Sequence, residues 1–444
     1  MFSNKTFCAL PWASIQINPS GNFKICCFSG NDGNHGVGKD ENGNVMNILT
    51  HSIEDALNSD LHKQLRLAQS RNERHPVCQV CWKKEDANFQ QIKAGMDFDH
   101  SESPLSHRIV RTFTHMSEFE DGITTESAPS VMQADGSIDH YPILLDIRFS
   151  NLCNAKCIQC EPQYSTLWYS DHIALTGSNK FNVGPKQYTI TQEGNKYVTN
   201  MVRWHDDPRW WEQFERIKGR LRRVYITGGE PFVQPSHDEF LDRLIASGHS
   251  KNITLEYDTN LTAINSKIIE RLSKFQAVRF SVSVDDTEKR YELIRYPSSW
   301  KTLLKNLEVV SKMDNVATSK ITTCIGIPTV FAPIRLAETF VPLGYDKFPK
   351  RLLRSPDVYD LAYLPDEAKI QVIAKYQEAD IPEKYKITTI GYLKNNLQKH
   401  SYQTCIERMD RFKTRMDKLD ELRGTDWKDT MPDVAELLHK HINI

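Results

Sequence analysis

Three cysteines, Cys153, Cys157 and Cys160, lie close together in the chain with the spacing CxxxCxxC. Three thiolates at this spacing can turn toward one metal cluster, whereas an iron-sulfur cube ordinarily takes four cysteine ligands. No histidine or fourth cysteine stands near them, so the set predicts a 4Fe-4S cluster with one iron open to a small molecule. The competing interpretation is a zinc knuckle, but tetrahedral structural zinc requires a closed set of four ligands.

A glycine-rich turn follows a strand-like run at residues 224–227. The turn reads Gly228-Gly229-Glu230-Pro231. Glycine lets a backbone adopt positive φ and approach a ligand closely. Main-chain groups and the Glu230 carboxylate could therefore hold an ammonium group at this point.

Polar residues also stand at the ends of two further expected strands. Asn260 and Ser283 end these strands, and Arg295 follows farther along the chain. The planar fork of arginine binds carboxylates through paired hydrogen bonds. The simpler interpretation is a helix cap at Asp285 or Asp286 and a solvated Arg295.

Taken together, these motifs resemble the signature of the radical S-adenosylmethionine (radical SAM) enzymes. In that superfamily SAM binds the open iron of a three-cysteine 4Fe-4S cluster, and one electron cleaves it to a 5′-deoxyadenosyl radical that removes a substrate hydrogen. The resemblance implies that Cys153, Cys157 and Cys160 hold the cluster. It also implies that SAM contacts Gly228, Gly229, Glu230, Pro231, Asn260, Ser283 and Arg295.

One position departs from the pattern of that superfamily. The residue before the last cysteine is often aromatic there, and here it is Gln159. This difference affects the expected contact with adenine and leaves the three iron ligands unchanged. The sequence identifies no catalytic acid or base.

A second set of cysteines lies near the N-terminus. Residues 13–17 and 23–27 read as two strands joined by a turn-rich connection, and residues 53–70 have apolar side chains at helical spacing. This order of elements would bring four thiols together. They belong to Cys8, Cys26, Cys78 and Cys81.

The N-terminal segment resembles the opening of the SPASM and twitch domains, which hold auxiliary iron-sulfur clusters. The resemblance implies one cluster with four cysteine ligands. Such a domain usually follows the SAM-binding barrel, but here it precedes it. A structural zinc site with the same four ligands is the alternative, and Cys27 could replace Cys26 in either case.

Composition limits the class of protein and its partners. With 444 residues and 39% hydrophobic content, the chain can bury a full core and form more than one domain. No apolar run is long enough for a membrane span, and no secretory signal is visible, so a cytoplasmic protein is expected. The 56 basic and 57 acidic residues nearly balance, which gives no indication of nucleic-acid binding.

The remaining pattern alternates strands and helices, which predicts an α/β fold with a parallel sheet. Six such units indicate a partial (β/α)6 TIM-like barrel, flanked by a small N-terminal cysteine-rich hairpin and helix domain and a helical C-terminal extension. Cys324 is expected to be a buried core thiol and Cys405 an inert one on a helix. The expected domains are residues 1–95 (auxiliary cluster), 96–140 (linker or insertion), 141–362 (barrel) and 363–444 (C-terminal extension).

The sequence therefore predicts a radical SAM enzyme of oxidoreductase type. It would use its auxiliary cluster to oxidise or cross-link a peptide or protein and receive electrons from a donor such as flavodoxin or ferredoxin. One alternative is the modification or dehydrogenation of a small polar metabolite or nucleotide. Another is a non-catalytic, zinc-stabilised binding protein.

Overall fold

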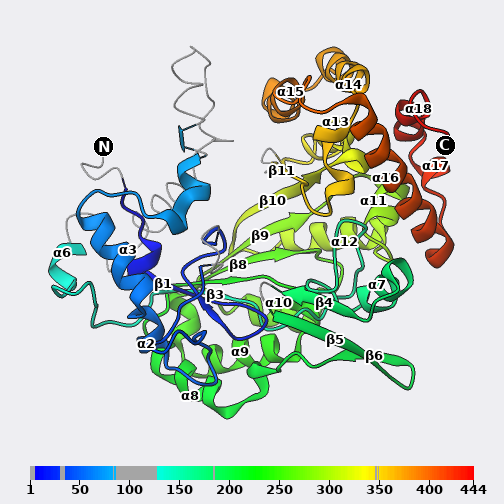
Figure 1. Ribbon diagram of the computed structural model, residues 1–444. Coiled ribbons are helices and arrows are strands. Elements are labelled where there is room, and N and C mark those ends of the chain that lie inside the picture. The colour runs from blue at the N-terminus through cyan, green and yellow to red at the C-terminus, as the bar shows by residue number, and fades with distance from the viewer. Residues whose placement is uncertain are drawn as a thin grey trace. The chain divides into compact units, whose positions relative to one another are not determined.

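A computed structural model describes residues 6–30, 36–83, 85–86, 128–183, 186–345, 348 and 350–444 (Figure 1). Most of the predicted linker 96–140 lies outside these ranges. The chain divides into two compact units, and two strands run from one into the other. The first unit is residues 1–150, 201–257 and 266–279, and the second is residues 151–200, 258–265 and 280–444.

One mostly parallel sheet has the strand order β11-β10-β9-β8-β7-β3-β1-β2. In the first unit, parallel pairs join β1 to β3, β3 to β7 and β7 to β8, and β2 is antiparallel to β1. In the second unit β10 is parallel to β11. The strands are β1 (Ser14–Ile17), β2 (Phe23–Lys24), β3 (Leu144–Ile147), β7 (Arg223–Ile226), β8 (Thr254–Thr259), β9 (Ala277–Ser283), β10 (Val316–Ile325) and β11 (Lys350–Leu352).

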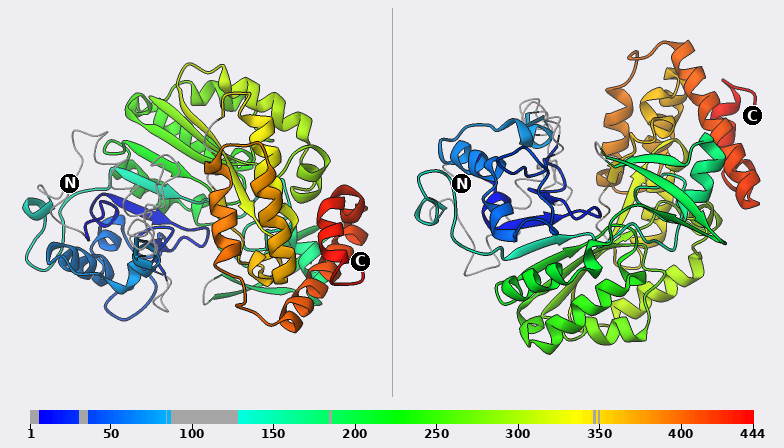
Figure 2. Two further views of the ribbon diagram at one scale, coloured as in Figure 1. Left: turned by 90° about the horizontal axis from the view of Figure 1, so that it is seen from above. Right: turned by 60° about the horizontal axis from the view of Figure 1, so that its bottom comes forward.

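Helices of the first unit follow or cover its strands. The amphipathic helix α8 begins with Asp207 as its N-cap and turns Trp210 and Phe214 inward. In Figures 1 and 2, α8 and α9 lie along one face of β3 and β7. The helices are α1 (Leu10–Ala13), α2 (Ile53–Leu57), α3 (Asp60–Ser70), α6 (Ala128–Val131), α8 (Pro208–Ile217), α9 (Pro235–Ala246) and α10 (Ser266–Leu272).

The second unit adds a small antiparallel sheet and the C-terminal helices. Its sheet has the order β4-β5-β6, formed by β4 (Lys180–Val183), β5 (Lys186–Glu193) and β6 (Lys196–Thr199). In Figure 1, α14 and α15 pack side by side. The helices are α7 (Trp168–Thr176), α11 (Glu288–Ile294), α12 (Trp300–Ser311), α13 (Ala332–Phe340), α14 (Asp366–Glu378), α15 (Ile387–Lys394), α16 (Tyr402–Arg423), α17 (Trp427–Thr430) and α18 (Pro432–His439).

The predicted α/β fold class is confirmed: strands β3 and β7 to β11 alternate with helices, and a helical region follows them. Several details differ from the prediction. Residues 53–70 form two helices, because the turn at Asn58 and Ser59 interrupts the helical hydrogen bonding before α3 begins. The last strand of the alternating pattern, β11, is short and is followed by short 3-10 helices.

A buried arginine joins the segments around the N-terminal hairpin. Arg66 of α3 is fully buried and donates hydrogen bonds to the carbonyl oxygens of Pro11 (2.9 Å), Leu57 (2.5 Å) and Gly136 (3.0 Å). Three separate segments therefore depend on one guanidinium. No helix in the described ranges combines the length and the apolar character that crossing a membrane requires.

Candidate functional site

The loop that carries Cys153, Cys157 and Cys160 follows β3 and has a firmly held backbone. The main-chain N–H groups of Lys156 and Ile158 donate to the carbonyl oxygens of Tyr296 and Ile294, at 2.7 and 2.8 Å. The indole Nε1 of Trp168 donates to the carbonyl oxygen of Cys157 at 2.8 Å. The thiols thus start from a fixed backbone within the second unit.

A buried charge cluster holds the same loop against two helices. Asp171 of α7 accepts from Lys156 Nζ at 2.7 Å and from Arg423 Nε at 3.0 Å. The side chains of Asp171 and Arg423 are 4% and 1% exposed. The Arg423 guanidinium also lies over the Trp168 ring, 5.2 Å from its centroid. Because Arg423 ends α16, a residue far along the chain stabilises the cysteine loop.

The thiols of the loop interact with one another. Cys160 donates a hydrogen bond to Cys157, which with the nearby Arg295 lowers the pKa of Cys157 to about 7. The same bond, together with burial and the charge of Cys153, raises the pKa of Cys160 well above its ordinary value. The donor set of three neighbouring sulfurs, one of them readily ionised, suits the thiolate ligands of an iron-sulfur cluster.

Asp285, directly after β9, gathers donors from three segments. It is fully buried, accepts from Arg295 Nη2 at 2.7 Å and from the backbone N–H of Cys324 at 2.7 Å, and also accepts from the amide of Gln159. Arg295 Nη1 reaches Cys157 Sγ at 3.8 Å. Although burial opposes its charge, the Asp285 carboxylate raises the pKa of Arg295.

Asn260 also contacts the cysteine loop in the second unit. Its Nδ2 donates to Oδ1 of Asn154, at 2.8 Å, and its own Oδ1 accepts from the backbone of Thr262 at 2.9 Å. Asn154 lies between Cys153 and Cys157. Ser283 is the last residue of β9 and is half-buried.

The predicted glycine turn lies in the first unit, after β7. Gly228 and Gly229 have φ values of 86° and 55°, and a Cβ on Gly228 would come within 2.9 Å of the side chain of Arg148. Glu230 is buried and caps the following 3-10 helix (Pro231–Val233) by accepting from the backbone of Phe232. The positive φ values and the close approach to Arg148 favour glycine here, and the contact of this turn with SAM stays a prediction.

Cys26 of the N-terminal set contacts two apolar clusters of the first unit. One cluster contains Cys8 with Leu10 and Leu144, and Cys26 packs together with Cys78 against the other. Burial raises the pKa of the Cys26 thiol, and the charge of Cys81 adds to this effect. Cys26 thus lies close to other members of the predicted set, and the assignment of the four ligands stays a prediction.

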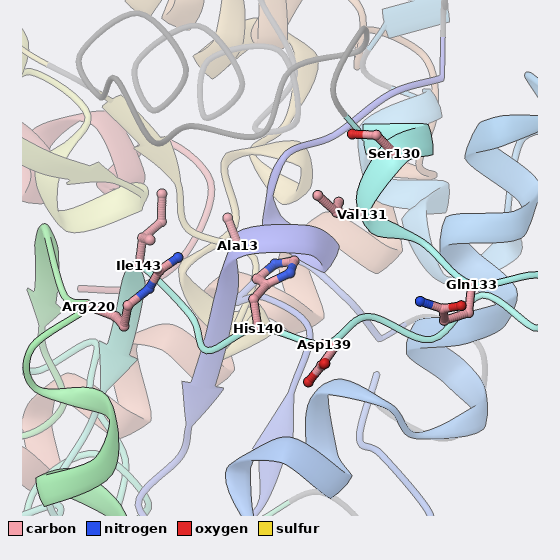
Figure 3. Close-up of a pocket in the computed structure, with 8 residues that line it drawn as sticks. All are labelled: Ala13, Ser130, Val131, Gln133, Asp139, His140, Ile143 and Arg220. Carbon is pink, nitrogen blue, oxygen red and sulfur yellow. The ribbon is translucent and has the colours of Figure 1, made fainter.

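Across the ranges that the structure describes, no three His, Cys, Asp or Glu side chains stand in an arrangement that would hold a metal ion. The individual ligand assignments therefore stay predictions. A cavity of about 340 Å³ lies in the first unit (Figure 3), and none of the residues that line it belongs to the predicted sites. Its lining residues are Ala13, Ser130, Val131, Gln133, Asp139, His140, Ile143 and Arg220.

Three residues near the cysteine loop were not identified as site residues from the sequence. The sequence indicates Asp285 only as a possible helix cap, Gln159 only as a departure from the superfamily pattern, and Cys324 only as a core thiol. Burial raises the pKa of Cys324 to about 12, and it is half-buried at the end of β10. The polar residue Gln159, at a position where an aromatic residue is common, is the one sequence feature that could have indicated a polar contact near the cysteine loop.

Two family models match the chain. Residues 147–331 match the Radical SAM superfamily, and residues 8–82 match the SPASM iron-sulfur cluster-binding domain. These domains imply a 4Fe-4S cluster with SAM and auxiliary iron-sulfur clusters. No match was found among curated proteins.

Solved structures with a similar fold include anSMEcpe with bound AdoMet, at 16% identity and a TM-score of 0.36, covering 58% of this chain and 61% of that one. Streptococcus suis SuiB bound to S-adenosylmethionine has 16% identity and a TM-score of 0.33, with 66% and 56% covered. SuiB bound to its precursor peptide SuiA has 15% identity and a TM-score of 0.33, with 72% and 64% covered. The chain thus matches less than two thirds of the length of each.

Proposed function

Because residues 147–331 belong to the radical SAM superfamily and residues 8–82 to the SPASM iron-sulfur cluster-binding domains, we propose that this chain oxidises or cross-links a peptide or protein. The bound cluster and SAM would supply a 5′-deoxyadenosyl radical that removes a substrate hydrogen. One observation carries the proposal: three neighbouring thiols project from a single loop with a fixed backbone after β3. Three protein ligands leave one iron of a cube to SAM.

Cys153, Cys157 and Cys160 are the proposed cluster ligands. Two kinds of contact support this role: the backbone hydrogen bonds from Lys156 and Ile158, and the buried ion pair between Lys156 and Asp171. These contacts fix the backbone of the loop and involve none of the three sulfurs. The proposed barrel domain is residues 141–362, between an auxiliary domain at 1–95 with a linker at 96–140 and an extension at 363–444.

We assign SAM binding to residues that follow the strands of the parallel sheet. The tight backbone at Gly228 and Gly229 and the buried carboxylate of Glu230 suit the methionine ammonium group. Buried Arg295 Nε has no hydrogen-bond partner among the described residues, which leaves a donor for a carboxylate. The full proposed set is Gly228, Gly229, Glu230, Pro231, Asn260, Ser283 and Arg295.

The auxiliary site would use Cys8, Cys26, Cys78 and Cys81. Its proposed role is to accept an electron from the substrate radical or to position the substrate, and the external electron donor would be a flavodoxin or ferredoxin. A small polar metabolite or nucleotide is the alternative substrate class. Four cysteine ligands also suit zinc, so a non-catalytic, zinc-stabilised binding protein is the alternative from another class.

The first test is metal analysis of anaerobically purified protein. About four irons and four sulfides are expected per cluster, with no stoichiometric zinc. Zinc without sulfide would contradict the enzymatic proposal and favour the binding protein.

The second test is Cys157→Ala, which removes one of three ligands. Reductive SAM cleavage should fall to background, measured as 5′-deoxyadenosine released under a strong reductant. The matched control is Cys405→Ser, because Cys405 is a buried thiol of α16 that donates a hydrogen bond to the carbonyl oxygen of Leu364. Cleavage that persists in Cys157→Ala would show that the ligand set is wrong.

A further inference from the structure

Asp285 and Asp286 are adjacent buried carboxylates with separate arginine partners. Asp285 pairs with Arg295 and Asp286 pairs with Arg335, at 2.7 and 2.6 Å. Both carboxylates are completely buried. Two similar ion pairs therefore stand side by side in the sequence, and they differ in what the arginine reaches next.

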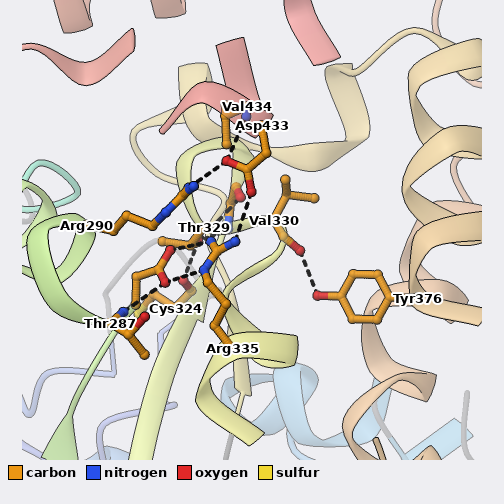
Figure 4. Close-up of polar contacts among 11 residues, drawn as sticks. Thr287, Arg290, Cys324, Thr329, Val330, Arg335, Tyr376, Asp433 and Val434 are labelled. Carbon is orange, nitrogen blue, oxygen red and sulfur yellow. Dashed lines mark hydrogen bonds and ion pairs between the residues drawn. The ribbon is translucent and has the colours of Figure 1, made fainter. Parts of the chain in front are cut away.

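Arg335 continues into a structural network. It donates to Asp433 of α18 at 2.9 Å, and Asp433 also accepts from Arg290 of α11 at 2.5 Å. Figure 4 shows Arg290, Arg335 and Asp433 pointing toward one another. The ion pairs of Arg335 with Asp286 and Asp433 thus join elements of the second unit.

Arg295 instead turns its second terminal nitrogen toward a sulfur. With Nη2 on Asp285, its Nη1 lies 3.8 Å from Cys157 Sγ, within range for an N–H···S hydrogen bond. The guanidinium is planar and its N–H directions are fixed relative to one another. The hydrogen bond between Asp285 and Nη2 therefore also sets the direction in which Nη1 of Arg295 points.

Gln159 completes the arrangement from the cysteine loop itself. Its amide donates to Asp285, so the residue before Cys160 contacts the same carboxylate that orients Arg295. Phenylalanine at this position would have no donor for this hydrogen bond. The polar residue at position 159 thereby connects the loop to the ion pair, and both contacts lie within the second unit.

We infer that Arg295, oriented by Asp285 and Gln159, donates a hydrogen bond to the sulfur of iron-bound Cys157 and raises the reduction potential of the 4Fe-4S cluster. The inference rests on the proposed cluster ligands. Reduction adds one electron from the flavodoxin or ferredoxin donor and makes the cluster more negative. A cationic N–H group at a ligand sulfur stabilises that added charge, since hydrogen bonds to sulfur and local charge set cluster potentials. Asp285 and Gln159 are positioning residues.

The experiment is a redox titration of the reconstituted full-length protein, followed by electron paramagnetic resonance. In the unchanged protein, the signal that changes on addition of SAM identifies the barrel cluster and separates it from the auxiliary one, and the same signal is then titrated in each variant without SAM. Arg295→Lys keeps the charge that Asp285 requires but loses the fork, and its midpoint should move to more negative potential. Iron and sulfide content should stay at the level of the unchanged protein.

A double variant protects the test against misfolding. Asp285→Asn with Arg295→Gln replaces the buried ion pair by neutral side chains of similar size, so no unpaired charge is left inside. Its midpoint should move in the same direction and farther than that of Arg295→Lys. Gln159→Leu, which removes only the orienting amide, should give a smaller shift of the same sign.

Arg335→Lys is the matched control, because it alters the neighbouring ion pair and should leave the midpoint unchanged. If the midpoint is equally unchanged in Arg295→Lys and in the double variant, with full iron and sulfide content, the inference is overturned and the proposed function stands. If the unchanged protein gives no SAM-responsive signal, the proposed function fails, and the inference fails with it.

Discussion

Cys153, Cys157 and Cys160 come from one short loop, whereas Cys8, Cys26, Cys78 and Cys81 come from three separate segments of the chain. The loop positions its thiols through its own backbone, which neighbouring carbonyl groups and Asp171 hold. The N-terminal set depends on how a hairpin, helix α3 and the segment after it pack together.

The difference shows where each set is vulnerable. Both regions are held by a buried arginine, Arg423 for the loop and Arg66 for the N-terminal set. Arg423 joins two helices to a loop that already carries its three thiols. Arg66 joins α3, the helix that precedes Cys78 and Cys81, to Pro11 in the segment that carries Cys8, so its loss should loosen the packing of these two segments.

The largest expected effect distinguishes adjacent cysteines in the N-terminal set. Cys26→Ala should remove the auxiliary cluster, because Cys26 packs against the apolar cluster that contains Cys8, shares a second cluster with Cys78 and interacts electrostatically with Cys81. Cys27→Ala is the matched control and should keep it. Iron and sulfide analysis checks the difference, about four irons per protein. Loss of iron in Cys27→Ala alone would reverse the assignment.

Removing the N-terminal arginine should have the next largest effect. Arg66→Ala leaves three buried carbonyl groups without their donor, which we expect to lower the free energy of unfolding by roughly 3–5 kcal/mol. Denaturant unfolding of the metal-free protein measures it. Arg71, the exposed residue that caps the C-terminal end of α3, provides a control. Arg71→Ala should change the free energy of unfolding by less than about 1 kcal/mol. Equal effects would contradict the proposed role of Arg66.

Disrupting the buried charge cluster of Asp171, Lys156 and Arg423 should lower the free energy of unfolding by a smaller amount. Asp171→Asn removes the counter-charge of Lys156 and Arg423 but keeps an acceptor oxygen, so a loss of roughly 2–3 kcal/mol is expected. Unfolding in denaturant provides the measurement. A loss as large as that of Arg66→Ala would remove the contrast between the two regions.

The smallest effect is a pH dependence of the N-terminal region. His62 of α3 is buried beside Arg66, and burial followed by that charge lowers the pKa of His62 well below its ordinary value. Below about pH 6.5 the unfolded chain binds a proton that the folded chain cannot, so stability falls by about 1.4 kcal/mol per pH unit. Above that pH both forms are neutral and the contribution is constant.

Thermal or denaturant unfolding between pH 7.5 and 5.5 checks this expectation. His62→Asn should flatten the slope, because the amide can still meet the hydroxyl of Ser59 without titrating. An unchanged slope in His62→Asn would show that another group is responsible.

The sequence was informative where chemistry is local. The loop of three cysteines, the glycines that require positive φ, and the alternation of strands and helices can each be recognised within a few residues. The small sheet β4-β5-β6 was not predicted, because its strands are mostly exposed and lack the apolar alternation of a buried sheet.

Contacts between distant segments could not be predicted from the sequence. Nothing near Asp171 indicates that Arg423 pairs with it, and nothing near Asp285 indicates its three donors. Such pairings arise from the packing of whole elements, so they follow from the fold and not from residue spacing.

The parallel pairing of β1 with β3, from Ser14 opposite Leu144 to Ile17 opposite Ile147, also limits how this protein can be divided. A truncated chain that starts at residue 141 would expose the N–H and C=O groups along one side of β3. Open strand edges recruit other chains, so the shortened protein should aggregate unless its edge is protected. Separate production of the barrel would therefore require charged or proline substitutions along β3.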